Sequence, residues 1–263
     1  IFLTTLKVKK LNVVMSGVLI SNAFLFFGVI IGLVMALTYA GTINADVGSL
    51  LKAHVYLVIG GYVAITVMSL SVVLIPMFGL SHGFSMRPLE ISIGAMSVAV
   101  ILVVLSSFVV SGVVEYLGYS LAIISLLVYF YFVYSIYKTR ARKEMDVYAR
   151  SLIFSYLSLA VSLFLGGAYL LSGRETLLLA TAWQMFFGFF GFLITGHAYK
   201  IIPFLVWFER FSPLVGKQKV PMLADMVPKR SSSAQFLFSS IGVSVVLAAI
   251  LLQSDLWLKA GAS

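Results

Sequence analysis

Seven long apolar stretches follow one another along the chain, and short polar segments separate them. A helix needs roughly 20 mostly apolar residues to cross the hydrocarbon core of a bilayer. The stretches are continuously apolar and do not alternate, which argues against the strands of a membrane barrel. The pattern therefore predicts an all-α, polytopic transmembrane helix bundle that forms a single domain over residues 1–263, with spans at about 13–39, 52–79, 91–114, 116–137, 149–172, 176–207 and 234–258.

The composition supports a membrane setting. Of the 263 residues, 61% are hydrophobic and 10% are charged, whereas about 25% of the residues of a soluble domain are charged. Such a chain cannot cover its surface with polar groups, so the lipid bilayer is its expected partner. The chain has no cysteine, which excludes disulfides, thiolate zinc sites and iron–sulfur clusters held by this chain alone. Because the sequence begins at Ile1 inside an apolar segment, we expect it to lack an N-terminal segment.

Lysine and arginine residues gather in alternate loops, which predicts an orientation. With the N-terminus in the cytoplasm, fourteen of them lie on the inner side and three on the outer side, while Lys200 falls inside a span. The net charge of +9 is therefore a topology signal and gives no reason to expect nucleic acid. We expect an integral protein of a bacterial inner (cytoplasmic) membrane with its C-terminus outside. The inner residues are Lys7, Lys9, Lys10, Arg87, Lys138, Arg140, Arg142, Lys143, Arg150, Arg210, Lys217, Lys219, Lys229 and Arg230, and the outer ones are Lys52, Arg174 and Lys259.

Three histidines are the main candidates for chemistry. An imidazole inside a bilayer is costly and usually serves as a ligand or in a proton path. We favour a functional role for His197, which lies deep in the sixth predicted span with Lys200 one turn away on the same face. For His54, near the outer end of the second span, a functional role and a packing role are both open. His82 follows that span and is interpreted as a loop residue, with a metal-binding role as the weaker alternative.

The second and sixth spans resemble each other. Each ends in a proline followed by large apolar residues, and proline frees the carbonyl four residues earlier in a helix. Glycines thin out both spans, which indicates close helix contact or clearance for a flat cofactor. A single offset along the sequence superposes Gly61 on Gly188, Ile75 on Ile202 and Pro76 on Pro203.

Two segments resemble small relatives of heme-copper oxidase subunit I. One runs from His54 through Gly60-Gly61-Tyr62 to Ile75-Pro76-Met77-Phe78, and the other is Gly196-His197-Ala198-Tyr199-Lys200-Ile201-Ile202-Pro203-Phe204-Leu205-Val206-Trp207. In that family a histidine near the outer end of an early helix is an axial ligand of low-spin heme b. The resemblance implies this role for His54.

The chain also departs from that family. An oxygen-reducing heme-copper centre together with a low-spin heme needs six histidines, and three are present. At most one heme with two histidine ligands is possible. His54 lies 22 residues before Pro76 and His197 six before Pro203, a difference of roughly 24 Å along a straight helix. Two nitrogens on one iron lie within about 4 Å of each other, so straight helices of equal depth argue against a shared iron. A displaced sixth helix or pairing between subunits would allow it, and His82 and His197, both near the inner side, form a second possible pair.

The leading interpretation is a subunit of a membrane redox or electron-transfer assembly that binds one b-type heme or a quinone. In it His54 and His197 are axial ligands, or quinone and proton contacts. Lys200 neutralises a propionate or an anionic quinone, and Tyr56 and Tyr199 donate hydrogen bonds. No catalytic residue of an oxidoreductase is assigned.

Two alternatives stay open. One is a structural or assembly subunit that holds other membrane subunits or forms a homo-oligomer. The other is a transporter for a small solute or a metal, with Met77, Met86 and His82 as soft ligands at the inner mouth.

Overall fold

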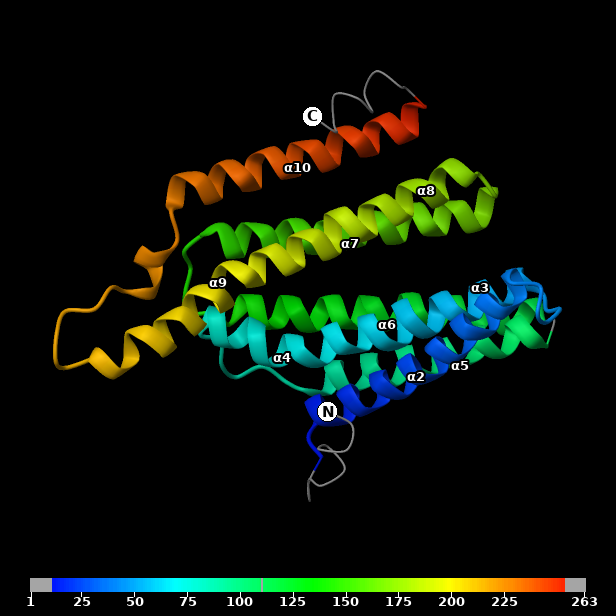
Figure 1. Ribbon diagram of the computed structural model, residues 1–263, viewed down its shortest axis with the longest axis horizontal. Helices are drawn as coiled ribbons and strands as arrows, with labels where there is room; N and C mark the ends of the chain where they lie inside the picture. Colours follow the sequence, from blue (N-terminus) through cyan, green and yellow to red (C-terminus); the bar gives the residue numbers. More distant parts are fainter. Residues whose placement is uncertain (1–10, 110, 254–263) are drawn as a thin grey trace. The chain divides into compact units, whose positions relative to one another are not determined.

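The computed structural model describes residues 11–109 and 111–253 and is all-α (Figure 1). Seven of its helical segments are long and apolar enough to cross a membrane, as predicted. They are Val13–Tyr39 (α2), Val47–Gly79 (α3, η1 and α4), Arg87–Phe108 (α5), Gly112–Lys138 (α6), Val147–Ser172 (α7), Glu175–Arg210 (α8, η2 and α9) and Lys229–Leu252 (α10).

Several observed ends differ from the predicted ones by a few residues, and at the second span a polar capping residue sets the start. The second span begins at Val47 rather than at residue 52, since the Asp46 carboxylate accepts the backbone N–H groups of Gly48 (3.1 Å) and Ser49 (3.3 Å). The seventh span begins at Lys229, before its predicted start at residue 234. Its predicted last residues, 254–258, lie outside the described residues, as do Lys7, Lys9, Lys10 and Lys259 of the orientation argument. The orientation stays a prediction.

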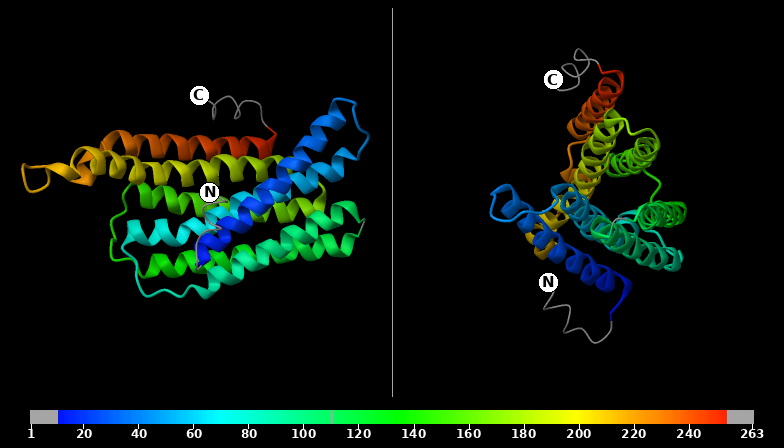
Figure 2. Two further views of the ribbon diagram at one scale, coloured as in Figure 1. Left: turned by 60° about the horizontal axis from the view of Figure 1, so that its bottom comes forward. Right: turned by 90° about the vertical axis from the view of Figure 1, so that its right-hand side faces the viewer.

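The helices form two compact units, residues 1–143 and 144–263. In the first unit α2 packs along all parts of the second span, and α5 packs against both that span and α6. In the second unit α7 packs along the whole sixth span, and α10 packs against α8, η2 and α7 (Figure 2). The prediction of a single domain is not tested by this division and stays a prediction.

A π-helical segment interrupts the middle of both long spans. In the second span η1 covers Tyr56–Ala64, between α3 (Val47–Val55) and α4 (Ile65–Gly79). In the sixth span η2 covers Gln184–Phe190, between α8 (Glu175–Trp183) and α9 (Gly191–Arg210). The offset that carries Gly61 onto Gly188 moves η1 onto residues 183–191, which contain the whole of η2. The repeat suggested by the sequence therefore extends to an uncommon backbone conformation.

The buried faces of the first helices repeat as well. The four buried residues of α2 are Gly17, Ser21, Phe24 and Gly28. A second offset, which carries Asn12 onto Asp146, brings these four onto buried serines of α7, namely Ser151, Ser155, Ser158 and Ser162. The same offset relates the caps, since Asn12 caps α2 through Met15 N and Asp146 caps α7 through Ala149 N.

A contact between the first two spans of the first unit recurs in the second unit, at the positions given by the two offsets described above. A Cβ added at Gly17 would lie 1.9 Å from Ser69 Oγ, and a Cβ added at Gly196 would lie 2.9 Å from Ser151 Cβ. Ser151 is the counterpart of Gly17, and Gly196 is the counterpart of Ser69. The same close approach is therefore built twice, with glycine and serine exchanged between the two helices.

The third helices of the units are related by a third offset, which carries Leu89 onto Ser232. Every buried residue of α10 falls on a buried residue of α5 under this offset. The pairs are Leu89 and Ser232, Val100 and Val243, Val103 and Val246, Ser106 and Ala249, and Ser107 and Ile250. Among the residues that the structure describes, α6 has no counterpart in the second unit.

The glycines of these spans serve close helix contact in the structure. A Cβ added at Gly28 would lie 2.9 Å from Val58, one at Gly61 would lie 2.6 Å from Phe24, and one at Gly188 would lie 2.6 Å from Ser158. Small residues let helix backbones approach closely in a membrane, where packing rather than the hydrophobic effect holds helices together.

The exchanged contact yields a stability test. Gly196→Ser places a side chain where Ser151 already lies, so we expect a loss of about 1–3 kcal/mol of unfolding free energy from overpacking. Adding Ser151→Gly reproduces the arrangement of Gly17 and Ser69 and restores most of the loss. Unfolding in detergent or lipid nanodiscs measures both variants. Gly94→Ser is the control, since nothing lies within 4 Å of a Cβ at Gly94; equal losses in the single and double variants would contradict the repeat.

Candidate functional site

The His54 imidazole is held between the first two helices of the first unit. Its Nδ1 lies 2.9 Å from the Gly28 carbonyl oxygen. A carbonyl only accepts, so Nδ1 carries the proton and donates, and the lone pair of the neutral ring is on Nε2. The ring lies over Gly32, where an added Cβ would be 3.0 Å from Cε1 and 3.2 Å from Nδ1. His54 is half-buried.

Thr181 takes the place of His54 in the second unit. A Cβ added at Gly166, the counterpart of Gly32, would lie 3.5 Å from the Thr181 methyl group. The hydrogen bond between the helices is kept there with its direction reversed, because the Ser162 hydroxyl donates to the Thr181 carbonyl at 3.0 Å. The position therefore bridges the two helices in both units, and only the first unit has an imidazole there.

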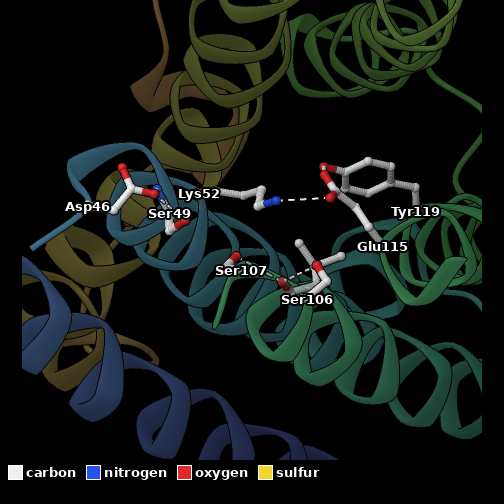
Figure 3. A network of polar contacts seen from close by, with 8 residues as sticks. Asp46, Ser49, Lys52, Ser106, Ser107, Glu115 and Tyr119 are labelled. Atoms are coloured by element: carbon white, nitrogen blue, oxygen red, sulfur yellow. Dashed lines mark hydrogen bonds and ion pairs between the residues drawn. The ribbon is translucent and has the colours of Figure 1, made fainter. Parts of the chain in front are cut away.

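A charged network begins at Lys52, two residues before His54 and on another face of the same helix (Figure 3). Lys52 Nζ lies 2.9 Å from Glu115 Oε2, and the side chains are 29% and 26% exposed. The Tyr119 hydroxyl donates to Glu115 Oε1. The Tyr56 ring stacks on the Tyr119 ring with a centroid distance of 5.6 Å. Tyr56, a predicted cofactor contact, thus packs on the network that joins the second span to α6.

Asp46 begins the helix that carries Lys52 and His54. Its carboxylate accepts from the Ser49 hydroxyl at 2.6 Å and from two backbone N–H groups. The Ser49 side-chain hydrogen bond, followed by the backbone hydrogen bonds of Gly48 and Ser49, holds the pKa of Asp46 below its ordinary value. A lowered pKa in the folded state means that this contribution is complete at neutral pH and is lost only as the pH falls through that pKa.

His197 lies near the end of the second unit at which α7 begins. Its ring meets the Tyr148 ring edge to face, with a centroid distance of 5.3 Å, and Tyr148 is the second residue of α7. Its Nδ1 donates to the Leu193 carbonyl of the same helix at 2.8 Å, which again puts the lone pair of the neutral ring on Nε2. The counterpart of His197 in the first unit is Leu70, so the two histidines are not repeat-related.

Lys200 is neutralised inside its own unit. Its Nζ lies 2.5 Å from Asp146 Oδ2, and the two side chains are 20% and 32% exposed. The other carboxylate oxygen, Oδ1, accepts the Ala149 N–H at 2.9 Å and caps α7. One carboxylate therefore fixes the start of α7 and supplies the counter-ion of a lysine within the sixth span.

Tyr199 and His82, the remaining predicted residues, occupy different surroundings. The Tyr199 hydroxyl donates to Gln235 Oε1 of α10 at 3.3 Å. His82 is exposed in the loop between α4 and α5. The part of the chain that the structure describes has no group of three or more histidine, aspartate or glutamate side chains able to hold a metal ion.

Seven apolar helices with buried close contacts identify the class of protein. The chain is a polytopic membrane protein. No protein-family model, curated protein or solved structure matches it. His54 belongs to the first unit of this membrane protein and His197 to the second, and a shared iron between them stays a prediction.

Asp146, Tyr148 and Tyr119 are among the residues of these clusters that were not singled out from the sequence. Asp146 carried a signal, because an aspartate directly before an apolar run is typical of a helix cap. Its pairing with Lys200, which is distant in the sequence, depends on how α9 passes the start of α7.

The repeat supplies a test of the Lys200–Asp146 pair, because the counterparts of these residues are the uncharged Val73 and Asn12. Asp146→Asn keeps a good capping group but leaves an ammonium group without its carboxylate, so we expect a loss of about 1–3 kcal/mol in unfolding free energy. The double variant with Lys200→Val copies the first unit and should recover most of this loss. Thermal unfolding in nanodiscs reports both, and a fully additive double variant would argue that the pair is energetically uncoupled.

Proposed function

We propose that this membrane protein is a subunit of a redox assembly that holds one b-type heme, with His54 as an axial ligand. The observation that carries the proposal is the hydrogen bond from His54 Nδ1 to the Gly28 carbonyl at 2.9 Å. Histidines that bind a metal almost always donate their other ring N–H to a carbonyl, a carboxylate or water, which fixes the tautomer and the ring orientation. His54 has this arrangement across two helices.

The surroundings of His54 fit such a ligand. Gly32 gives the ring a flat helix surface to lie on, since an added Cβ would meet three ring atoms at 3.0–3.9 Å. The residue as a whole is half-buried. Lys52 lies two residues before His54, and its charge is paired with that of Glu115. These residues orient a neutral imidazole at a membrane-spanning helix without adding net charge beside it.

His197, in the second unit, is the candidate for a contact to a quinone. Its Nδ1 also donates to a backbone carbonyl, so the same tautomer argument holds. Heme supplies one-electron transfer whose potential depends on the axial ligands and the burial of the group. The chain's contribution would be to hold the imidazoles and to exclude water with its apolar helices.

Optical spectroscopy of the purified protein tests the heme proposal. After reconstitution with hemin, we expect a Soret band and a reduced-minus-oxidised α-band typical of b-type cytochromes. His54→Ala should abolish the α-band because it removes the ligand. His82→Ala is the matched control, since His82 is an exposed loop residue.

A second variant separates ligation from folding. Gly32→Ala pushes a methyl group against the His54 ring, and we expect roughly a tenfold weaker heme affinity, as for second-shell changes at metal sites. Gly94→Ala, where nothing lies within 4 Å, should leave the affinity unchanged. A folded protein that shows no Soret band with excess hemin would rule out the heme site.

A second candidate function is transport of a small solute, and the paired π-helical segments favour it. Interrupted helices at corresponding positions of two repeats are the best pointer to a substrate site in membrane transporters. Here η1 and η2 coincide under the offset that carries Gly61 onto Gly188.

Uptake into proteoliposomes tests transport without partner subunits. If the chain is a transporter, deleting Ile59 should convert η1 toward a regular helix, because i→i+5 hydrogen bonds take up one residue more per turn, and abolish uptake. Vesicles without protein and vesicles with the heme-deficient His54→Ala variant are the controls. Uptake no faster than in empty vesicles, for a panel of labelled metals and small organic ions, would eliminate this candidate.

A further inference from the structure

The repeat identifies a helix-binding face on α10. In the first unit α6 covers one face of α5, where the Ser125 hydroxyl donates to the Ser92 carbonyl at 2.7 Å. A Cβ added at Gly118 of α6 would lie 2.6 Å from Val103 and 3.2 Å from the Ala99 carbonyl oxygen. Ser92, Met96 and Ala99 are buried in this unit. In the first unit, α6 therefore packs on this face of α5.

The corresponding face of α10 is more open. The offset that carries Leu89 onto Ser232 also carries Ser92 onto Gln235, Ala95 onto Phe238, Met96 onto Ser239 and Ala99 onto Gly242. Gln235 and Phe238 are exposed, and Ser239 and Gly242 are half-buried. Ser92, Met96 and Ala99 are buried in α5, whereas their three counterparts in α10 are exposed or half-buried. We call Gln235, Phe238, Ser239 and Gly242 the α10 face.

The chemistry of the α10 face differs from that of a lipid-facing surface. Gln235 Nε2 donates to Ser239 Oγ at 3.1 Å, and Gln235 Oε1 accepts from Tyr199 at 3.3 Å. A primary amide has two N–H donors and two acceptor lone pairs, so these two bonds use half of its capacity. Polar side chains on a membrane helix act as hydrogen-bonding contacts between helices, and small residues such as Ser239 and Gly242 allow close approach.

We propose that the α10 face binds the α10 face of a second copy of this chain, so that the protein is a dimer in the membrane. Two copies inserted in the same orientation present Gln235 at the same depth. An amide is self-complementary because it both donates and accepts, and the face has no charged residue that would repel its copy. Gln235, Ser239 and Gly242 follow a spacing of four and three residues, which places them on one side of a helix. A two-fold axis along the membrane normal brings this side against itself.

Cysteine cross-linking in the membrane tests the dimer, because the chain has no cysteine of its own. Ser239→Cys should give a disulfide-linked dimer under mild oxidation. Leu237→Cys is the matched control, since Leu237 is 54% exposed but lies on the opposite side of α10, where its α5 counterpart Gly94 is also exposed. Equal cross-linking at the two positions, or none at Ser239→Cys, would overturn the proposal.

A second measurement uses no cysteine. Gln235→Leu keeps an apolar helix surface and removes the amide, so the dimer dissociation constant measured by dilution in lipid vesicles should rise about 3- to 30-fold. The unfolding transition of the variant reports whether it is folded. A monomeric protein at every protein-to-lipid ratio, or an unchanged dissociation constant in a folded variant, would also reject the dimer. If Ser239→Cys links only to another membrane protein, the face binds a different partner and the proposal fails.

Discussion

Close approach of the first two helices is the constraint on which each unit depends. In a bilayer the lipid is as apolar as the side chains, so helices stay together through packing and hydrogen bonds between them. Glycine and serine supply both here: Gly17 meets Ser69, Gly196 meets Ser151, and the Ser155 hydroxyl donates to the Phe189 carbonyl at 2.9 Å. The His54 ring enters the same seam against Gly32. The best candidate for chemistry in this chain is therefore also part of its packing.

The sequence was sufficient for the seven spans because hydropathy alone determines them. It was sufficient for only part of the repeat. The offset between the second and sixth spans was visible in Gly61 with Gly188 and in Pro76 with Pro203, where the residue type is kept. The offset between α2 and α7 was hidden, because Gly17 and Ser151 share a position and a contact without sharing a side chain. Each contact pairs one glycine with one serine, so the combined volume of the two facing side chains is the same in both units. This relation becomes visible only when the facing helices are compared together.

The candidate site was predictable in its histidines but not in its hydrogen bonds. His54 was identified by its position in an apolar span, whereas its partner is a backbone carbonyl of Gly28, which no side-chain pattern marks. Lys200 was expected to meet an anionic cofactor, which stays a prediction, and the structure adds an ion pair between its ammonium group and Asp146. Both side chains thus find their partners within their own units, as the high cost of an unsatisfied group in lipid requires.

The presence of the extra helix α6 can be understood from whether the number of membrane crossings is odd or even. Three crossings are an odd number, so a module of three spans leaves the chain on the side of the membrane opposite to the one on which it began. A second copy joined directly to it would be inserted upside down, with all of its caps and loop charges facing the wrong compartment. One additional crossing returns the chain to its starting side. If every one of the seven spans crosses the bilayer once, α6 is this additional crossing, because it follows the third span and precedes α7.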